Sequence, residues 1–368
     1  MKRCMLIPLL LVSLLLLSGC LFTVNHPQLA LDGTVAVFLE DDGSYTLFPE
    51  TGLLHLLRGE EWIPVDGATL AGTGGLLDLS PDGTEGLYVD TTSEGFLEGT
   101  TSTVYRVPLR PEAAPKLIWE TDETIVRAAW ADDETILFFT FGDEGLLGAL
   151  RALDPVAGRL EQLAVDLLSF AVCPDRDELV LLVADQNESP SIGTALLWNP
   201  ADDVRTILAS FALNDLTLES YGMLPHSFLW DISPDGAWLA LCLYDSTLIE
   251  PMANPDVPSL YLIDVEGGEA ERIAEGALMP AFSPDGTGLI YAAQADDETA
   301  ILMWRDVLTE GAEPIEGSKG ISTAFWLSPT QLGMTFEGAE ERYRLVMLDL
   351  IAEEFTELVG DHDASDPE

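Results

Sequence analysis

The tetrapeptide Ser-Pro-Asp-Gly occurs three times in the chain, at residues 80–83, 233–236 and 283–286. Each copy follows a short apolar stretch and precedes another that is rich in β-branched or aromatic residues. Ser, Pro and Gly at the first, second and fourth positions suit a type I turn, and Gly can adopt the left-handed conformation that closes a short hairpin loop. The tetrapeptide therefore predicts a tight turn between two antiparallel strands.

Degenerate copies of this turn fill the intervals, at residues 30–33, 131–133, 173–175 and 328–330. The first turn residue then recurs with a period near fifty, which indicates a propeller or a solenoid. Each repeat also contains four short strand-like stretches, and no long amphipathic helix pattern interrupts them. We predict an all-β fold, a β-propeller of about seven four-stranded blades over residues 27–360. Six blades is the alternative, because the copies at residues 30 and 131 are weak.

The repeat of apolar strand, Ser-Pro-Asp-Gly, apolar strand and acidic loop resembles that of TolB-like propellers, which is also found in the propeller parts of prolyl oligopeptidases. The resemblance covers nearly the whole chain after its N-terminal segment, and it implies the fold rather than a function. TolB itself has an α/β domain before its propeller, whereas here only residues 21–26 separate Cys20 from the first repeat. The role of TolB is therefore not implied.

The N-terminus has the features of a secretion signal. Lys2 and Arg3 precede an apolar stretch, residues 5–17, that is too short to span a bilayer comfortably. The following Leu-Ser-Gly-Cys at residues 17–20 resembles the lipobox of bacterial lipoproteins, which implies cleavage after residue 19 and acyl chains, such as palmitate, on Cys20. We expect residues 20–26 to tether the protein to the cell membrane or outer membrane, on its extracytoplasmic side. The alternative is an ordinary secretory signal with an incidental cysteine.

The chain is strongly acidic. The signal holds two of the 16 basic residues and none of the 64 acidic ones, so the mature chain has a formal net charge of −50. This charge repels nucleic acid and attracts cations and basic proteins. Adaptation to high salt, or solubility alone, would give the same composition. We expect the acidic tail, residues 361–368, to be disordered.

Signatures of catalysis and of metal binding are scarce. The four His residues of the chain have no metal-ligand spacing, and no nucleophile elbow or phosphate-binding loop appears. We assign no catalytic residue and no cofactor, and a bound cation such as calcium remains an alternative. Cys173 and Cys242 are expected to be buried thiols, and a disulfide between them is the alternative.

Two carboxylates occupy the same position of the repeat, two residues before the turn. These are Asp78 and Asp231, which the propeller fold places on the first strand of a blade, the strand that lines a central channel. They are candidate channel carboxylates that bind a cation. The alternative is that each accepts hydrogen bonds from the backbone of a neighbouring blade.

A second set of candidate residues marks a partner-binding face. Long connections at residues 90–102, 185–194 and 245–258, together with an insertion at residues 211–225, are expected to emerge on one side, where binding loops usually lie. An acidic residue also follows the second strand of every repeat, and this set either meets a basic partner or cation or forms ordinary polar strand ends. With two apolar residues of the insertion, the candidate residues are Asp41, Asp90, Asp143, Asp185, Asp245, Asp296, Glu337, Tyr221 and Met223.

These features together predict a monomeric, lipid-anchored β-propeller at the cell envelope that binds a protein partner without catalysing a reaction. The alternative function is that of a carbohydrate-active lyase or hydrolase, or a cation-dependent enzyme, with its site at the mouth of the channel.

The lipid anchor gives the first testable prediction. Mass spectrometry of the mature protein should find acylated Cys20 as its first residue, and Cys20→Ala should leave an unprocessed precursor, because the thiol that accepts the lipid is missing. A mature chain that begins at another residue and carries no lipid would contradict the lipobox interpretation.

Overall fold

The computed structural model describes most of the chain after residue 26. The signal segment, Cys20, the tether and the acidic tail lie outside the described residues. The described residues are 27–29, 34–40, 43–46, 51–58, 61–71, 73–92, 101–112, 114–132, 134–141, 147–173, 178–185, 191–213, 229–243, 257–295, 299–309, 311–337 and 343–360.

The described residues form strands and turns, and no helix occurs among them, which confirms the all-β prediction. Accordingly, the described part of the chain has no helix that is long and apolar enough to span a membrane. The chain divides into two compact units. We call residues 22–144, 149–163 and 330–368 the terminal unit, and residues 164–329 the central unit.

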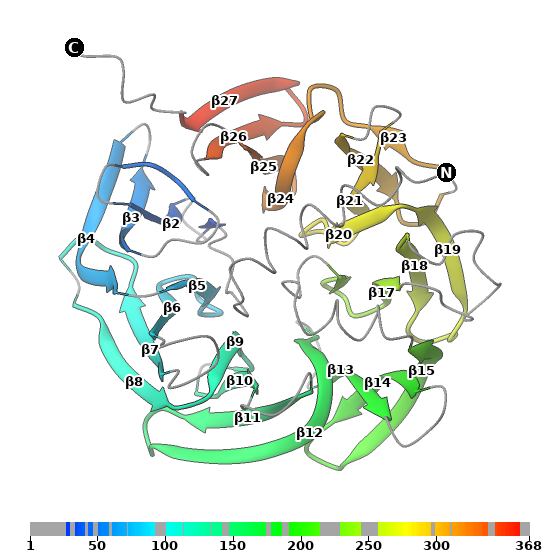
Figure 1. Cartoon of the computed structure of the whole chain (residues 1–368), viewed down its shortest axis with the longest axis horizontal. Helices are drawn as coiled ribbons and strands as arrows, with labels where there is room; N and C mark the ends of the chain where they lie inside the picture. The colour runs from blue at the N-terminus through cyan, green and yellow to red at the C-terminus, as the bar shows by residue number, and fades with distance from the viewer. Residues whose placement is uncertain are drawn as a thin grey trace. The chain divides into compact units, whose positions relative to one another are not determined.

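The terminal unit contains the strands from both ends of the chain (Figure 1). All neighbouring strands whose register is resolved pair antiparallel, in chain order. The first sheet is β1 (Gln28–Leu29), β2 (Val35–Leu39), β3 (Gly52–Arg58) and β4 (Glu61–Leu70), and the second is β5 (Thr73–Leu79), β6 (Glu85–Thr92), β7 (Thr101–Pro108) and β8 (Lys116–Thr121). The unit also holds β9 (Thr124–Trp130), β10 (Ile136–Phe141) and β11 (Gly148–Asp154), and later β25 (Gln331–Glu337), β26 (Tyr343–Asp349) and β27 (Glu354–Val359).

In the central unit, too, consecutive strands pair antiparallel. After β12 (Arg159–Val172) it contains β13 (Leu179–Asp185), β14 (Ser191–Asn199) and β15 (Val204–Leu213), and then β16 (Trp230–Ile232), β17 (Trp238–Leu243), β18 (Ser259–Asp264) and β19 (Ala270–Glu275). The last strands of the unit are β20 (Ala277–Phe282), β21 (Gly288–Gln294), β22 (Ala300–Asp306), β23 (Glu313–Pro314) and β24 (Ile321–Ser328).

Among the described residues, hydrogen bonding between strands defines six sheets, five with four strands and one with seven. The seven-stranded sheet arises because β12 is a single strand of 14 residues that follows β11 and also pairs with β13. Two of the seven sequence repeats therefore share one sheet. The count of seven blades stays a prediction.

The Ser-Pro-Asp-Gly turns connect the first two strands of a repeat, as predicted. In the third copy, Gly286 N donates to Ser283 O (2.8 Å), and Gly286 has a φ of +72°. Side chains complete the turn, because Ser283 Oγ donates to Asp285 Oδ1 (2.5 Å) and accepts from Gly288 N (2.9 Å). The copies at residues 80–83 and 233–236 repeat these bonds. The degenerate copy at residues 30–33 lies outside the described residues.

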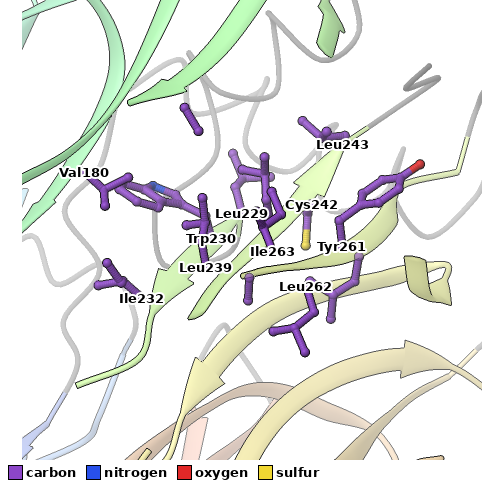
Figure 2. Packing of buried hydrophobic residues seen from close by; sticks show 14 of the residues in the cluster. Val180, Leu229, Trp230, Ile232, Leu239, Cys242, Leu243, Tyr261, Leu262 and Ile263 are labelled. Carbon is purple, nitrogen blue, oxygen red and sulfur yellow. The ribbon is translucent and has the colours of Figure 1, made fainter. Parts of the chain in front are cut away.

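The core lies between neighbouring sheets rather than on one face of each. Strand β10, for example, is buried along its whole length, which explains why second strands read as continuous apolar runs. Of the residues directly before the turns, Trp130, Ile232, Phe282 and Leu327 are buried as expected. Leu79 and Val172 are half-buried instead. Figure 2 shows part of the largest cluster, around Trp230, Leu239, Cys242 and Tyr261 of the central unit.

The left-handed conformation at the turns gives a second prediction. Gly286→Ala should lower the free energy of unfolding by about 1 kcal/mol, because a Cβ is disfavoured at positive φ. Gly286→Asn is the matched control, since Asn tolerates this conformation. If chemical denaturation shows that both variants lose the same free energy of unfolding, the backbone conformation at Gly286 is not the cause of the loss.

Candidate functional site

Asp78 links the second sheet to the next repeat through a hydrogen bond, and we call such a link between first strands a tie. It lies on β5, where Oδ1 accepts a hydrogen bond from Leu79 N (2.9 Å) and Oδ2 accepts one from Trp130 N (2.8 Å) on β9. Both carboxylate oxygens are thus bonded to backbone amides. Burial raises the pKa of Asp78 to about 6, although these hydrogen bonds and the nearby charge of Arg127 oppose the shift.

Asp231 forms the equivalent tie in the central unit. Its Oδ2 accepts a hydrogen bond from Phe282 N (2.8 Å) on β20. Trp130 and Phe282 occupy the same position, directly before the turn of the following repeat. Each carboxylate therefore accepts a hydrogen bond from the backbone amide at the same repeat position, on the first strand of the following repeat. Such a hydrogen bond to a neighbouring repeat is what the alternative interpretation of Asp78 and Asp231 expects. In the described part of the chain, no group of three His, Cys, Asp or Glu residues could hold a metal ion.

Aromatic side chains make comparable ties elsewhere in the central unit. Trp326, at the repeat position of Asp78 and Asp231, donates from Nε1 to Ala281 O (3.1 Å). Trp230 donates from Nε1 to Ser169 Oγ (2.8 Å) in the buried core. Neighbouring first strands are thus joined by polar bonds from several residue types at nearly the same level of the repeat.

The partner-face acids that the structure describes lie at one end of their sheets. Asp90 is near the end of β6, Asp185 ends β13, and Glu337 ends β25. Asp185 and Glu337 are exposed, whereas Asp90 is half-buried and accepts hydrogen bonds from Ala71 N with both oxygens (3.2 and 3.1 Å). We call this the loop end of a sheet, and the opposite end, which carries the turns between first and second strands, the turn end.

The other six predicted face residues lie outside the described residues. These are Asp41, Asp143, Asp245, Asp296, Tyr221 and Met223. The predicted start of the insertion is wrong, because residues 211–213 complete β15 and Phe211 is buried against Gly193.

A second recurrent turn, which the sequence reasoning missed, connects third and fourth strands at the turn end. The carboxylate of Asp154 accepts from Val156 N (2.9 Å) and Ala157 N (2.8 Å), and Asp349 accepts from Ile351 N and Ala352 N (2.9 Å each). Asp264 accepts from two amides in the same way, and at equivalent positions Asp306 accepts from Leu308 N and the amide oxygen of Asn199 accepts from Ala201 N. The signal was an Asp or Asn at the end of the five third strands β11, β14, β18, β22 and β26. In four of these strands it lies four residues before a residue with positive φ: Gly158, Asp203, Gly268 or Glu353.

Two arginines on third strands form ion pairs with acidic residues on other strands. Arg106 on β7 pairs with Glu85 and lies over the Trp130 ring, 5.0 Å from its centroid. Arg305 on β22 is almost fully buried and pairs with Glu271 (2.9 Å). Arg151 on β11 pairs with Glu123, which lies between β8 and β9 at the loop end.

The two cysteines of the central unit are free thiols, so the structure does not contain the alternative disulfide. Both are buried, as expected, and Cys242 lies within the cluster shown in Figure 2. Burial raises the pKa of the Cys242 thiol, which keeps it protonated and unreactive.

No protein-family model matches the sequence, and no curated protein matches it. Among solved structures, the chain is similar to the β-propeller domain of the trilobed protease from Pyrococcus furiosus, which is described as having an open velcro topology. The TM-score is 0.61 at 15% identity, over 94% of this chain and 98% of that chain. An acylaminoacyl peptidase is similar with a TM-score of 0.61 and 14% identity, over 93% of this chain and 53% of that chain.

The chain therefore has a β-propeller fold, in agreement with the predicted fold class. TolB from Acinetobacter baumannii is also among the similar structures, with a TM-score of 0.44 and 11% identity over 75% of this chain and 69% of that chain. At these identities the likeness concerns the fold alone.

The buried tie at Asp78 gives a third prediction. Because its pKa is raised in the folded state, folding favours the protonated form, and the contribution of Asp78 to stability is largest below about pH 4 and declines as the pH rises through 6. The free energy of unfolding lost in Asp78→Asn should therefore shrink between pH 4 and pH 7, by about 1–3 kcal/mol.

Asp82→Asn is the contrasting control. Hydrogen bonds from Ser80 and Thr84 lower the pKa of Asp82, so its contribution is present at neutral pH and is lost as the pH falls. Denaturation curves at several pH values should show opposite trends for the two variants. The same trend in both would contradict the assigned causes.

Proposed function

We propose that this protein is a lipid-anchored, extracytoplasmic β-propeller of about seven blades that binds a protein partner at the cell envelope without catalysing a reaction. The lipid would be carried on Cys20. Residues 21–26, fully extended at about 3.5 Å each, reach roughly 20 Å, so the propeller would lie close to the membrane surface.

The observation that carries this proposal is the difference between the two ends of the sheets. At the turn end, short connections satisfy their own backbone amides with Ser, Asp and Asn side chains. At the loop end, the connections are longer and the second strands finish with the exposed acids Asp185 and Glu337. Long loops on a rigid scaffold are the usual place for binding.

The charge of the chain indicates the class of partner. A mature net charge of −50 accelerates association with a basic protein and repels acidic surfaces. In the described residues, the ion pairs of Arg106 and Arg305 lie near the turn end, and Arg151 pairs with Glu123 at the loop end. We infer a partner with a basic surface, held after encounter by apolar residues such as Tyr221 and Met223.

The fourth prediction tests both parts of this mechanism on a partner recovered by pull-down from solubilised envelopes. Replacing Asp90, Asp185 and Asp245 together by Asn should slow association several-fold at low salt, because electrostatic steering weakens. Deleting residues 214–224, which spares β15, should accelerate dissociation instead.

A matched control removes the same charge from the turn end, where Glu112, Glu134 and Glu161 are exposed. The triple Gln variant at these positions should associate at nearly the wild-type rate. Unchanged kinetics in both loop-end variants, with slower association in the turn-end variant, would move the binding face to the opposite end.

A further inference from the structure

The large apolar side chains that the terminal unit exposes lie at one end of its sheets. Its described residues expose four of them: Leu117, Val156, Ile351 and Phe355. Val156 and Ile351 lie in turns between third and fourth strands, and Leu117 and Phe355 are the second residues of the fourth strands β8 and β27. All four therefore belong to the turn end.

Val156 and Ile351 occupy the same position of the recurrent Asp turn, two residues after Asp154 and Asp349. In each turn the carboxylate accepts a hydrogen bond from the backbone amide of the apolar residue (2.9 Å in both). The turn is thus held with the aliphatic side chain in solvent, and Val156 is 87% and Ile351 79% exposed. Aliphatic side chains on two rigid turn tips at one repeat position are suited to entering an apolar medium.

Contacts between sheets place these turn ends on the same side of the terminal unit. Arg58 Nη2, at the end of β3, donates to Leu109 O (3.2 Å), so the third-to-fourth connections of the first two repeats meet. The Asp78 tie joins the second and third repeats directly before their turns. Tyr343 N donates to Tyr45 O (3.0 Å), so the loop ends of the first and last sheets also meet. The turn ends of these repeats therefore face the same way.

Exposed basic side chains gather at the same end. In the described part of the terminal unit, five Lys and Arg residues are exposed, and four of them, Arg58, Arg110, Lys116 and Arg159, lie at third-to-fourth connections. The fifth, Arg344, is at the loop end and pairs with Glu357 (3.7 Å).

We call residues 58–61, 109–117, 154–161 and 349–355 the rim. Its described residues hold about one basic residue for every two acidic ones, against 14 to 64 in the mature chain. The rim therefore meets far less repulsion from an anionic surface than the chain as a whole would.

The start of the first sheet allows the rim to reach a membrane. Strand β1 pairs with the first residues of β2, Gln28 with Ala36 and Leu29 with Val35, so it lies close to the turn end. Gln28 is thus about 7 Å from the end of the sheet, whereas residues 21–26 reach roughly 20 Å when extended. A lipid on Cys20 can therefore lie in a bilayer that contacts the rim.

We propose that the rim is a membrane-contact surface: Val156 and Ile351 enter the interface of the bilayer, and the basic side chains of the rim bind the phosphates of its headgroups. Aliphatic side chains gain free energy on leaving water, and neighbouring cations attract anionic lipid. The proposal rests on the proposed lipid anchor and adds an orientation to it. The turn end faces the membrane, and the loop end stays free for a protein partner.

Spin-label accessibility on vesicles of phosphatidylethanolamine and phosphatidylglycerol tests this orientation. The acylated mature chain carries a nitroxide at Val156→Cys, at Ile351→Cys or, as the matched control, at the exposed loop-end position Glu337→Cys, while Cys173 and Cys242 are buried. Relative to the unlipidated chain in solution, the ratio of collisions with oxygen to collisions with a water-soluble nickel chelate should rise several-fold at 156 and 351, because oxygen concentrates in the bilayer. An unchanged ratio at these positions, or a rise at 337, would overturn the proposal.

An artificial anchor separates this proposal from the lipobox interpretation. Residues 21–368 include every described residue, and a synthetic lipopeptide ligated to their N-terminus attaches them to the same vesicles. If the native chain lacks an acyl group but the ligated chain shows the expected ratios, only the anchor is refuted. If the ligated chain shows no rise at 156 or 351, the membrane contact is refuted whatever the native anchor is.

The basic side chains have a test of their own. Replacing Arg110, Lys116 and Arg159 together by Gln should lower the oxygen-to-nickel ratio at position 156 about twofold or more, because attraction to anionic lipid is lost. Arg344→Gln is the matched control, since it removes an exposed cation from the loop end. Equal ratios in the two variants would show that the rim does not bind headgroup phosphates.

Discussion

The structure depends on the hydrogen bonds by which short side chains close the turns between consecutive strands. A type I turn leaves backbone amides without partners, and Ser283 Oγ and Asp285 Oδ1 accept from those of Gly288 and Thr287. With the turn fixed, the first two strands leave it in one register, and the remaining strands of the sheet add to this hairpin.

Part of the unusual acidity therefore has a structural cause. Asp82, Asp235 and Asp285 accept amides between first and second strands, and Asp154, Asp264 and Asp349 accept them between third and fourth strands. Asp78 and Asp231 join neighbouring first strands. Among the remaining acids, Asp185 and Glu337 are exposed at the loop end, where the proposed binding face lies.

The sequence was informative wherever the relevant contacts are local. The turns at Ser233 and Ser283 lie where they were predicted, between the first two strands of a repeat, because turn chemistry acts over a few positions. The positions of Asp78 and Asp231 were also found, since the repeat aligns them. Their exact partners were not, because the choice between a cation and an amide depends on the neighbouring sheet. The hydrogen bond from Trp62 Nε1 to Leu358 O had no local signal at all, because the two residues belong to opposite ends of the chain.

The two free thiols have a practical consequence for anyone who studies this protein in solution. With Cys20 carrying lipid, Cys173 and Cys242 would be the only thiols of the mature chain, and both lie in the core of the central unit. An alkylating reagent can react with them only when that core is exposed to solvent. The native chain thus contains its own chemical reporter for the central unit, which registers unfolding there without any introduced label.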